Sequence, residues 1–193
     1  MSTNNLNTLL SELLKQTLNS KKLDKIVANN KDIKINAFVD EKNKQTLLHK
    51  VVLDNKLLSA KWLLENHANP YIEDINGMTP FFLIVHSKIP RKFLDLFIEF
   101  HIDLDYKNPH KRILLQDSIL SGNYPLTKKI IEKTKKPFSS DIYGRNILFD
   151  AISSGSIEII DFIYNYEDKN KDLNICDIKG NSLLHHFKDT KIS

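Results

Sequence analysis

The sequence predicts an all-α fold in which helix-turn-helix pairs repeat along the chain and stack as a solenoid with protruding turns or hairpins. Three observations predict it. A turn motif recurs at a nearly constant spacing, apolar residues with helical spacing follow each turn, and a polar or glycine break precedes a second apolar segment. A single short helix of this kind cannot bury its apolar face alone. We therefore expect the helices of a pair to pack on each other, and each pair on the next.

Residues 141–164 show one repeat most clearly. Asp141 and Gly144 are turn formers, because aspartate hydrogen-bonds nearby backbone and glycine adopts positive φ at little cost. The apolar spacing over 147–152 predicts a first helix of about three turns. Gly155 is expected to end that helix in the left-handed conformation, and 157–163 predict a second, more apolar helix.

The same register recurs along the chain. First helices are expected to start near Thr46, Thr79, Ile113, Asn146 and Ser182, in successive steps of 33, 34, 33 and 36 residues. Their starts, such as Thr-Leu-Leu-His over 46–49 and Ser-Leu-Leu-His over 182–185, together with a period near 33, resemble the ankyrin repeat. The resemblance covers roughly residues 5–193. Lys44 and Lys111 depart from it, because each stands where the turn glycine is expected.

The resemblance implies a single ankyrin-repeat domain over 1–193. Its parts would be an N-terminal capping repeat at 5–40, repeats at 41–73, 74–107, 108–140 and 141–176, and an incomplete last repeat at 177–193. Because the second helix of that last repeat is missing, we expect the natural chain to continue past Ser193 or this segment to be poorly ordered. The resemblance also implies that His49 and His185 hydrogen-bond across their turns, a structural task.

The leucines between Leu6 and Leu18 form a strong helical stripe, and Leu23, Ile26 and Val27 form a shorter one. This pattern favours a capping repeat over a membrane-surface helix, because the polar positions are mixed rather than lysine-rich. Trp62 and the phenylalanines of the third repeat are interpreted as core, with an exposed anchor as the alternative for Trp62. The aromatic set is Phe81, Phe82, Phe93, Phe97 and Phe100.

Composition limits the function classes. The single cysteine, Cys176, excludes an internal disulfide and fits a reducing compartment such as the cytoplasm. No apolar run is long enough for a membrane span, and the N-terminus lacks the features of a secretory signal, although export into a host cell by another route stays open. A net charge of +4 does not by itself indicate nucleic-acid binding. We expect a monomer.

The sequence shows no catalytic pattern. It has no glycine-rich phosphate loop and no nucleophile elbow, and the spacing of Cys176 with His185 and His186 matches no zinc site. We therefore predict no catalytic residues, no cofactor and no metal. The function predicted is a protein-interaction module or scaffold. The alternative is the N-terminal targeting arm of a larger bacterial effector or enzyme whose catalytic part lies beyond residue 193.

The ankyrin resemblance implies that partners contact the turn tips and the ends of the first helices, on the concave side of the solenoid. The predicted contact residues are Lys42, Asn43, Gln45, Asn76, Met78, His86, His110, Arg112, Tyr143, Arg145 and Lys179. These tips carry four cations and no carboxylate, which suggests either a solvated face or a ridge for an acidic protein segment. Tyr143 and Arg145 would then be the main anchors, because tyrosine and arginine dominate interface hot spots.

Overall fold

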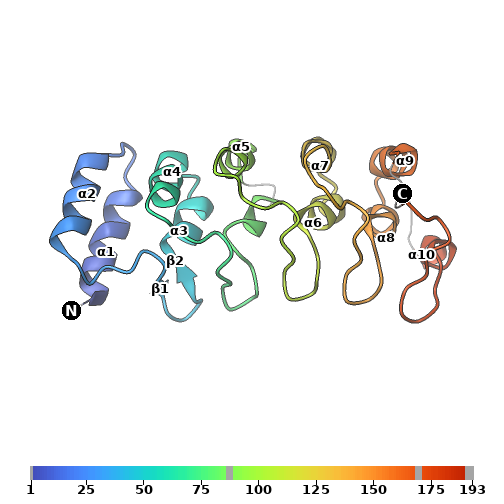
Figure 1. Ribbon diagram of the computed structural model, residues 1–193, viewed down its shortest axis with the longest axis horizontal. Helices are drawn as coiled ribbons and strands as arrows, with labels where there is room; N and C mark the ends of the chain where they lie inside the picture. The colour runs from blue at the N-terminus through green and yellow to red at the C-terminus, as the bar shows by residue number, and fades with distance from the viewer. Residues whose placement is uncertain (1, 86–88, 168–170, 190–193) are drawn as a thin grey trace. The chain divides into compact units, whose positions relative to one another are not determined.

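A computed structural model describes residues 2–85, 89–167 and 171–189. Contacts between backbone positions divide the chain into two compact units. Unit 1 comprises Met1–Ile102 and unit 2 comprises Asp103–Ser193. Both units are predominantly helical, as the sequence predicts, and Figure 1 shows their helices arranged as successive pairs linked by loops. The prediction of a single domain with six parts stays a prediction.

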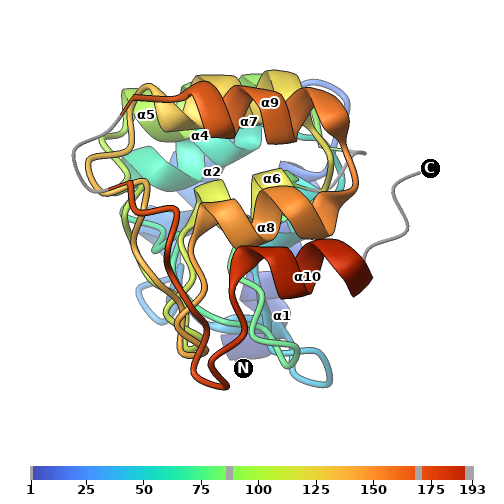
Figure 2. The same ribbon diagram turned by 90° about the vertical axis from the view of Figure 1, so that its right-hand side faces the viewer.

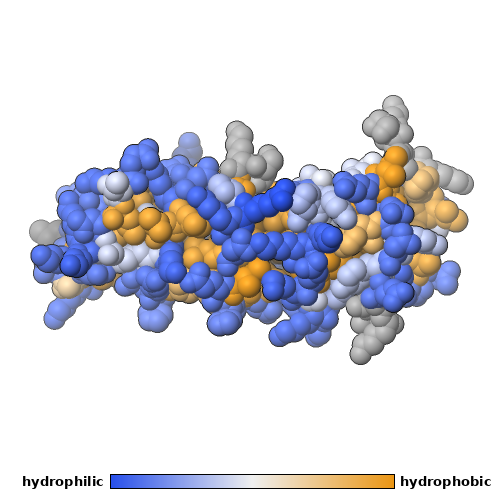
Figure 3. Space-filling view, turned by 90° about the horizontal axis from the view of Figure 1, so that it is seen from above, coloured by the Kyte–Doolittle hydropathy of each residue, from blue (hydrophilic) through white to orange (hydrophobic). Residues whose placement is uncertain are grey.

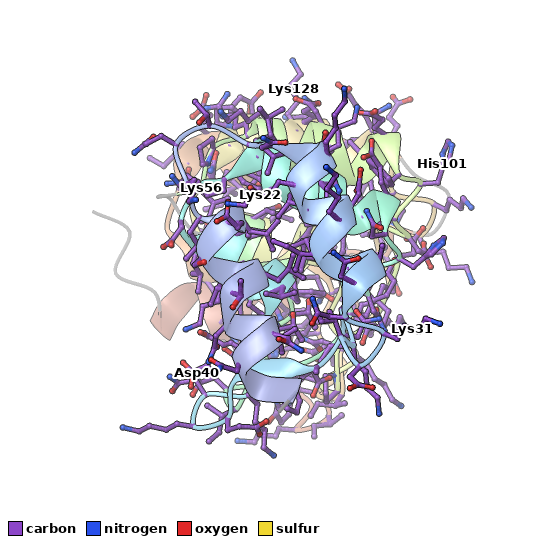
Figure 4. The ribbon with its side chains drawn as sticks, turned by 90° about the vertical axis from the view of Figure 1, so that its left-hand side faces the viewer. Lys22, Lys31, Asp40, Lys56, His101 and Lys128 are labelled. Atoms are coloured by element: carbon purple, nitrogen blue, oxygen red, sulfur yellow. The ribbon has the colours of Figure 1, made fainter. Side chains whose placement is uncertain are left out.

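Unit 1 contains three helix pairs and one short hairpin. Its elements are α1 (Ser2–Leu13), α2 (Ser20–Asn29), β1 (Phe38–Asp40), β2 (Gln45–Thr46), α3 (Leu47–Leu53), α4 (Leu57–Glu65), the 3-10 helix η1 (Phe82–Val85) and α5 (Lys92–Glu99). Helix α1 packs on α2, α3 packs on α4, and α4 packs on α5. The strands β1 and β2 pair antiparallel, with Phe38 opposite Thr46, and form a short hairpin, a feature that the predicted fold class includes. Figure 4 shows Asp40 at this hairpin, away from Lys22 on α2.

Unit 2 repeats the same arrangement. Its elements are α6 (Leu114–Leu120), α7 (Tyr124–Ile131), α8 (Ile147–Ser154), α9 (Ile157–Asn165) and α10 (Leu183–Asp189). The pairs are α6 with α7 and α8 with α9, and the first helices α6, α8 and α10 pack in succession. Figure 2 shows α10 beside α8, on the side away from α9. Within this unit, α6 and α8 therefore each pack against the second helix of their own pair and against a neighbouring first helix.

Several local predictions are refined by the structure. Helix α8 has eight residues, about two turns rather than three, and Gly155 ends it with a left-handed φ of 66°. Helix α5 begins at Lys92, and the carbonyl of Pro90 just before it accepts from the N–H of Phe93. The described part of the third repeat's first helix, Phe82–Val85, is 3-10 rather than α-helical.

The aromatic side chains of the third repeat form the core of unit 1. Phe81 makes edge-to-face contacts with Phe82 and Phe97, at centroid distances of 5.7 Å each, and all three are buried. Trp62 on α4 is also buried and donates from Nε1 to Asp24 Oδ1 at 2.9 Å. The interpretation as core is confirmed for Phe81, Phe82, Phe93 and Phe97, whereas Phe100 is only half-buried. Trp62 is likewise part of the core and is not an exposed anchor.

Lys44 and Lys111 have the left-handed backbone conformation that glycine has at the equivalent position of the other turns. Their φ angles are 53° and 57°, while Gly77, Gly144 and Gly180 have φ between 73° and 78°. A side chain in this region strains the backbone by roughly 1–2 kcal/mol, although glycine also loses more entropy on folding.

We expect Lys111→Gly to raise the free energy of unfolding by about 0.5–1 kcal/mol, because it relieves this strain. Urea unfolding of the two proteins measures the difference. The matched control is Gly77→Lys, which faces open space but has φ of 73°, and which should destabilise by a similar amount. A stability loss in Lys111→Gly would contradict the assigned turn conformation.

Candidate functional site

Four turns share one hydrogen-bonded frame. Each begins with an Asp or Asn whose Oδ1 accepts from the backbone N–H groups two and four residues later, at 2.8–3.0 Å. The backbone N–H of the same residue donates to the carbonyl four residues later. The first residues of these turns are Asp74, Asn108, Asp141 and Asp177. The turn N–H groups are thus satisfied internally, which fixes the backbone of each tip.

Adjacent turn tips within each unit are joined by backbone hydrogen bonds. In unit 1, the N–H of Ile75 donates to the carbonyl of Asn43 at 2.9 Å. In unit 2, Ile142 donates to His110 and Ile178 donates to Tyr143, both at 3.0 Å. These bonds hold neighbouring tips at a fixed spacing, so their side chains form a preorganised row within a unit.

A polar residue in three of the first helices hydrogen-bonds back to its turn. Nδ1 of His49 accepts from the N–H of Thr46, so its Nε2–H donates to the carbonyl of Met78 in the next turn at 3.1 Å. Burial lowers the pKa of His49, which keeps the ring neutral. His185 accepts from the N–H of Ser182 in the same way. The structural role predicted for His49 and His185 is therefore confirmed.

Gln116 replaces the histidine in the fourth repeat. Its Oε1 accepts from the N–H of Ile113 at 3.1 Å, and its Nε2 donates to the carbonyl of Arg145 and to Asp150. The amide therefore makes the same two connections as His49, one to its own turn and one to the next. This role of Gln116 was not predicted from the sequence.

Arg112 lies at the centre of a cluster of carboxylates in unit 2. Its Nε donates to Asp117 at 2.7 Å and its Nη1 donates to Asp150 at 3.0 Å and to Asp141 at 3.4 Å. The Arg112 side chain is only 12% exposed. Burial acts to lower the pKa of Arg112, but the Asp150 and Asp117 carboxylates outweigh it and raise that pKa.

The cluster holds more carboxylates than guanidinium groups. Arg145 is its second cation and donates to Asp141 at 3.3 Å. Burial raises the pKa of Asp150 to about 6, against the opposing effect of Arg112 and Gln116, and the Asp141 carboxylate adds to the rise. Among the described residues, Arg112 Nη2 and Arg145 Nε are buried nitrogen atoms without a hydrogen-bond partner.

The raised pKa of Asp150 predicts a pH dependence of stability. Between its ordinary value of 3.8 and about 6, the folded protein binds a proton that the unfolded chain has released, so this group's contribution to stability falls as pH rises through that window. Asp150→Asn should remove this part of the dependence. Urea unfolding at pH 4, 5, 6 and 7 measures the slope for both proteins, and an equal slope in the variant would contradict the assignment to Asp150.

A hollow of about 270 Å³ lies between the 141–145 and 177–181 turns of unit 2. Tyr143, Arg145, Ile178 and Lys179 line it, and the Arg145 guanidinium lies over the Tyr143 ring at 4.9 Å from its centroid. Among the described residues, no group of three or more His, Cys, Asp or Glu side chains is placed to hold a metal ion.

Comparison with known proteins agrees with this geometry. No protein-family model matches the chain. It is 26% identical over 162 residues to the ankyrin repeat protein OPG189 of vaccinia virus strain Copenhagen, covering 82% of this chain and 27% of the viral protein. OPG189 of monkeypox virus gives the same identity and coverage. Over most of its length the chain is thus similar to proteins named for ankyrin repeats.

A human protein is also similar over part of this chain. The transient receptor potential cation channel subfamily A member 1 is 24% identical over 127 residues, which cover 64% of this chain and 11% of the channel. The chain spans about a quarter of the length of the viral relatives that it matches. None of the helices formed by the described residues has the length and apolarity required to cross a membrane. The likeness to ankyrin-repeat proteins supports an interaction module in general terms.

The structure places most of the predicted contact residues at the turn tips. The exposed ones are Lys42, Asn43, Asn76, His110, Tyr143 and Lys179. Gln45, Met78 and Arg145 are half-buried, and His86 lies outside the described residues. Arg112 differs from the rest because its guanidinium turns inward to Asp117, Asp141 and Asp150, and so contributes little to a surface.

The carboxylates beneath the tips were missed by sequence reasoning. Asp150 stands inside the apolar run of α8 and is buried, and Asp117 stands on the facing helix α6. A charged residue within an apolar helical stripe is the signal that could have indicated a buried partner, because buried charges are paired. Asp150 lies 38 positions from Arg112 in the sequence, so the sequence did not indicate that Arg112 is its partner.

Proposed function

We propose that this chain is a protein-interaction module that binds a partner protein through its ankyrin turn tips and the ends of its first helices. The observation that carries the proposal is the set of Asp- and Asn-capped turns, linked to one another within each unit, that hold exposed polar and aromatic side chains in fixed positions. A preformed surface loses little conformational entropy on binding, so more of the contact energy appears as affinity.

Charge favours an acidic partner segment. Lys42 and Lys44 are exposed at the first tip of unit 1, and Lys111 and Lys179 are exposed at tips of unit 2. By contrast, the carboxylates of Asp74 and Asp141 are buried within the turn frames, where each accepts backbone hydrogen bonds. The solvent-facing charge of these tips is therefore mainly positive, which complements an acidic segment.

The other face of unit 2 is less suited to this role. Seen from the side of α7 and α9, it mixes hydrophilic and hydrophobic areas (Figure 3). A groove there is lined by Glu158, Asp161 and Glu167 around the rings of Tyr124 and Phe162. Its acidic rim would repel an acidic segment, which favours the turn tips as the contact surface. The alternative, a targeting arm of a larger effector or enzyme, and the cytoplasmic location both stay predictions.

Affinity capture with matched variants tests the proposal. Tyr143→Ala removes a 45% exposed ring from a turn tip, and Tyr164→Ala removes a 58% exposed ring from α9. A partner retained by the wild type and by Tyr164→Ala, but lost from Tyr143→Ala, would support the proposal. A partner that is retained by Tyr143→Ala and lost only from Tyr164→Ala would place recognition on the second helices and overturn it.

Salt provides a second test of the same proposal. With the captured partner purified, its dissociation constant should rise by about three- to tenfold between 50 and 300 mM salt, because exposed charges are screened. The variant Lys42→Glu/Lys44→Glu should lower the affinity at low salt more than Lys133→Glu, an exposed control on unit 2 just beyond α7. An affinity independent of salt would reject the acidic segment.

A further inference from the structure

The hollow between the last two described turns of unit 2 has the composition of a side-chain subsite. Its walls come from two different turns, with Tyr143 and Arg145 on one side and Ile178 and Lys179 on the other. The backbone bond from the Ile178 N–H to the Tyr143 carbonyl, at 3.0 Å, fixes the spacing of these walls. The hollow thus exists before any partner arrives.

Two of the residues that line the hollow, Arg145 and Lys179, are cations that can bind an anionic group. Lys179 is exposed, and Arg145 is 33% exposed. The described contacts of the Arg145 guanidinium are one ion pair from Nη2 to Asp141 and its position over the Tyr143 ring. Arg112, in contrast, donates to three carboxylates. Arg145 is therefore less fully committed to the protein's own acids.

Asp177 also lines the hollow, and its carboxylate is already hydrogen-bonded within the protein. Asp177 Oδ1 accepts from the backbone N–H groups of Lys179 and Asn181, and its Oδ2 accepts from the Asn181 amide and contacts His186 at 3.3 Å. Burial acts to raise the pKa of Asp177, but these hydrogen bonds outweigh it and hold the pKa well below its usual range. With Arg145 and Lys179, the lining still carries an excess of positive charge.

The remaining walls are apolar and exposed. The Tyr143 ring is 45% exposed and the Ile178 side chain is 68% exposed, although both are large and hydrophobic. Such residues beside cations suit a side chain that has an aliphatic stem and an anionic head. Glutamate has this form, and aspartate has a shorter version of it.

We propose that this hollow is the subsite for an acidic side chain, preferably glutamate, from an extended segment of the partner protein. The carboxylate would lie between the Arg145 guanidinium and the Lys179 ammonium, with its stem against Tyr143 and Ile178. This inference rests on the proposed function and specifies one contact of it, because the same turn tips carry both.

Nuclear magnetic resonance titration tests the subsite without a known partner. The probe is a 12-residue peptide of alternating glutamate and alanine, and its control is the same peptide with glutamine in place of glutamate. The acidic peptide should shift the amide signals of Tyr143, Arg145 and Ile178–Asn181, while the glutamine peptide should not. Lys179→Glu should weaken binding of the acidic peptide by about fivefold or more, and Tyr143→Ala by about threefold.

The controls separate the subsite from the proposed function. Lys133→Glu changes the net charge equally but lies beyond α7, away from the lining residues, and should leave the dissociation constant within twofold of the wild type. Shifts confined to residues 42–45 or 76–78 would overturn the subsite and leave the proposed function standing. Equal shifts from the glutamine peptide, or from inorganic phosphate at the same charge concentration, would also overturn it, as would no shift at all. The capture experiment judges the proposed function independently.

Discussion

Arg112→Ala is expected to destabilise unit 2 by about 3–5 kcal/mol, because it leaves buried carboxylates without their cation. Asp141 and Asp150 are buried, and Arg112 donates to both as well as to Asp117. Arg112 lies in the turn before α6, and Asp117 lies on α6. Asp141 lies in the turn between α7 and α8, and Asp150 lies on α8. The loss therefore acts between two repeats rather than inside one helix.

Hydrogen exchange of the α6 and α8 amides, combined with urea unfolding, measures this loss. The double variant Arg112→Ala/Asp150→Asn should recover part of the stability, because one of the stranded carboxylates becomes neutral. Lys133→Ala serves as the matched control, since it removes an exposed cation from the same unit. If Arg112→Ala behaved like Lys133→Ala, the inward orientation of Arg112 would be contradicted.

Phe97→Ala should destabilise unit 1 by about 3–5 kcal/mol through loss of apolar contact and formation of a cavity. Phe97 lies on α5, is fully buried and packs edge-to-face on Phe81. Phe97→Leu retains part of the volume and should cost less than the alanine variant.

The fluorescence of Trp62 provides the measurement for unit 1. Trp62 is the only tryptophan of the chain and lies buried on α4, which packs on α5. The urea midpoint followed by its fluorescence should fall most in Phe97→Ala and less in Phe97→Leu. Equal midpoints for Phe97→Ala and the wild type would contradict the placement of Phe97 in this core.

The repeat register could be predicted from the sequence because it depends on local chemistry. Turn residues such as Asp141 act on backbone within four residues, and Gly155 acts at its own position, so both roles are readable without the rest of the chain. Apolar spacing likewise indicates which face of each helix is buried. The buried residues Ile147 and Leu148 on α8 agree with that spacing.

The polar contacts between repeats could not be predicted in the same way. Arg112 and Asp150 are 38 positions apart, and the periodicity of apolar residues does not indicate which charges meet. As a result, Arg112 and Arg145 looked alike in the sequence, although the structure buries one among carboxylates and leaves the other beside a hollow. Protruding hairpins were predicted in general, but the strands β1 and β2 were not placed, because they have only three and two residues.

The proposed recognition surface requires turn tips that are rigid before a partner binds. Amide hydrogen exchange of the free protein tests this rigidity directly at Asn76, Met78, Tyr143 and Arg145, whose N–H groups donate to Asp74 or Asp141. We expect these amides to exchange at least about a hundredfold more slowly than in an unfolded chain, with protection similar to the ends of the neighbouring helices. Exchange at the rate of an unfolded chain would contradict this rigidity, and the preorganised surface would have to be abandoned.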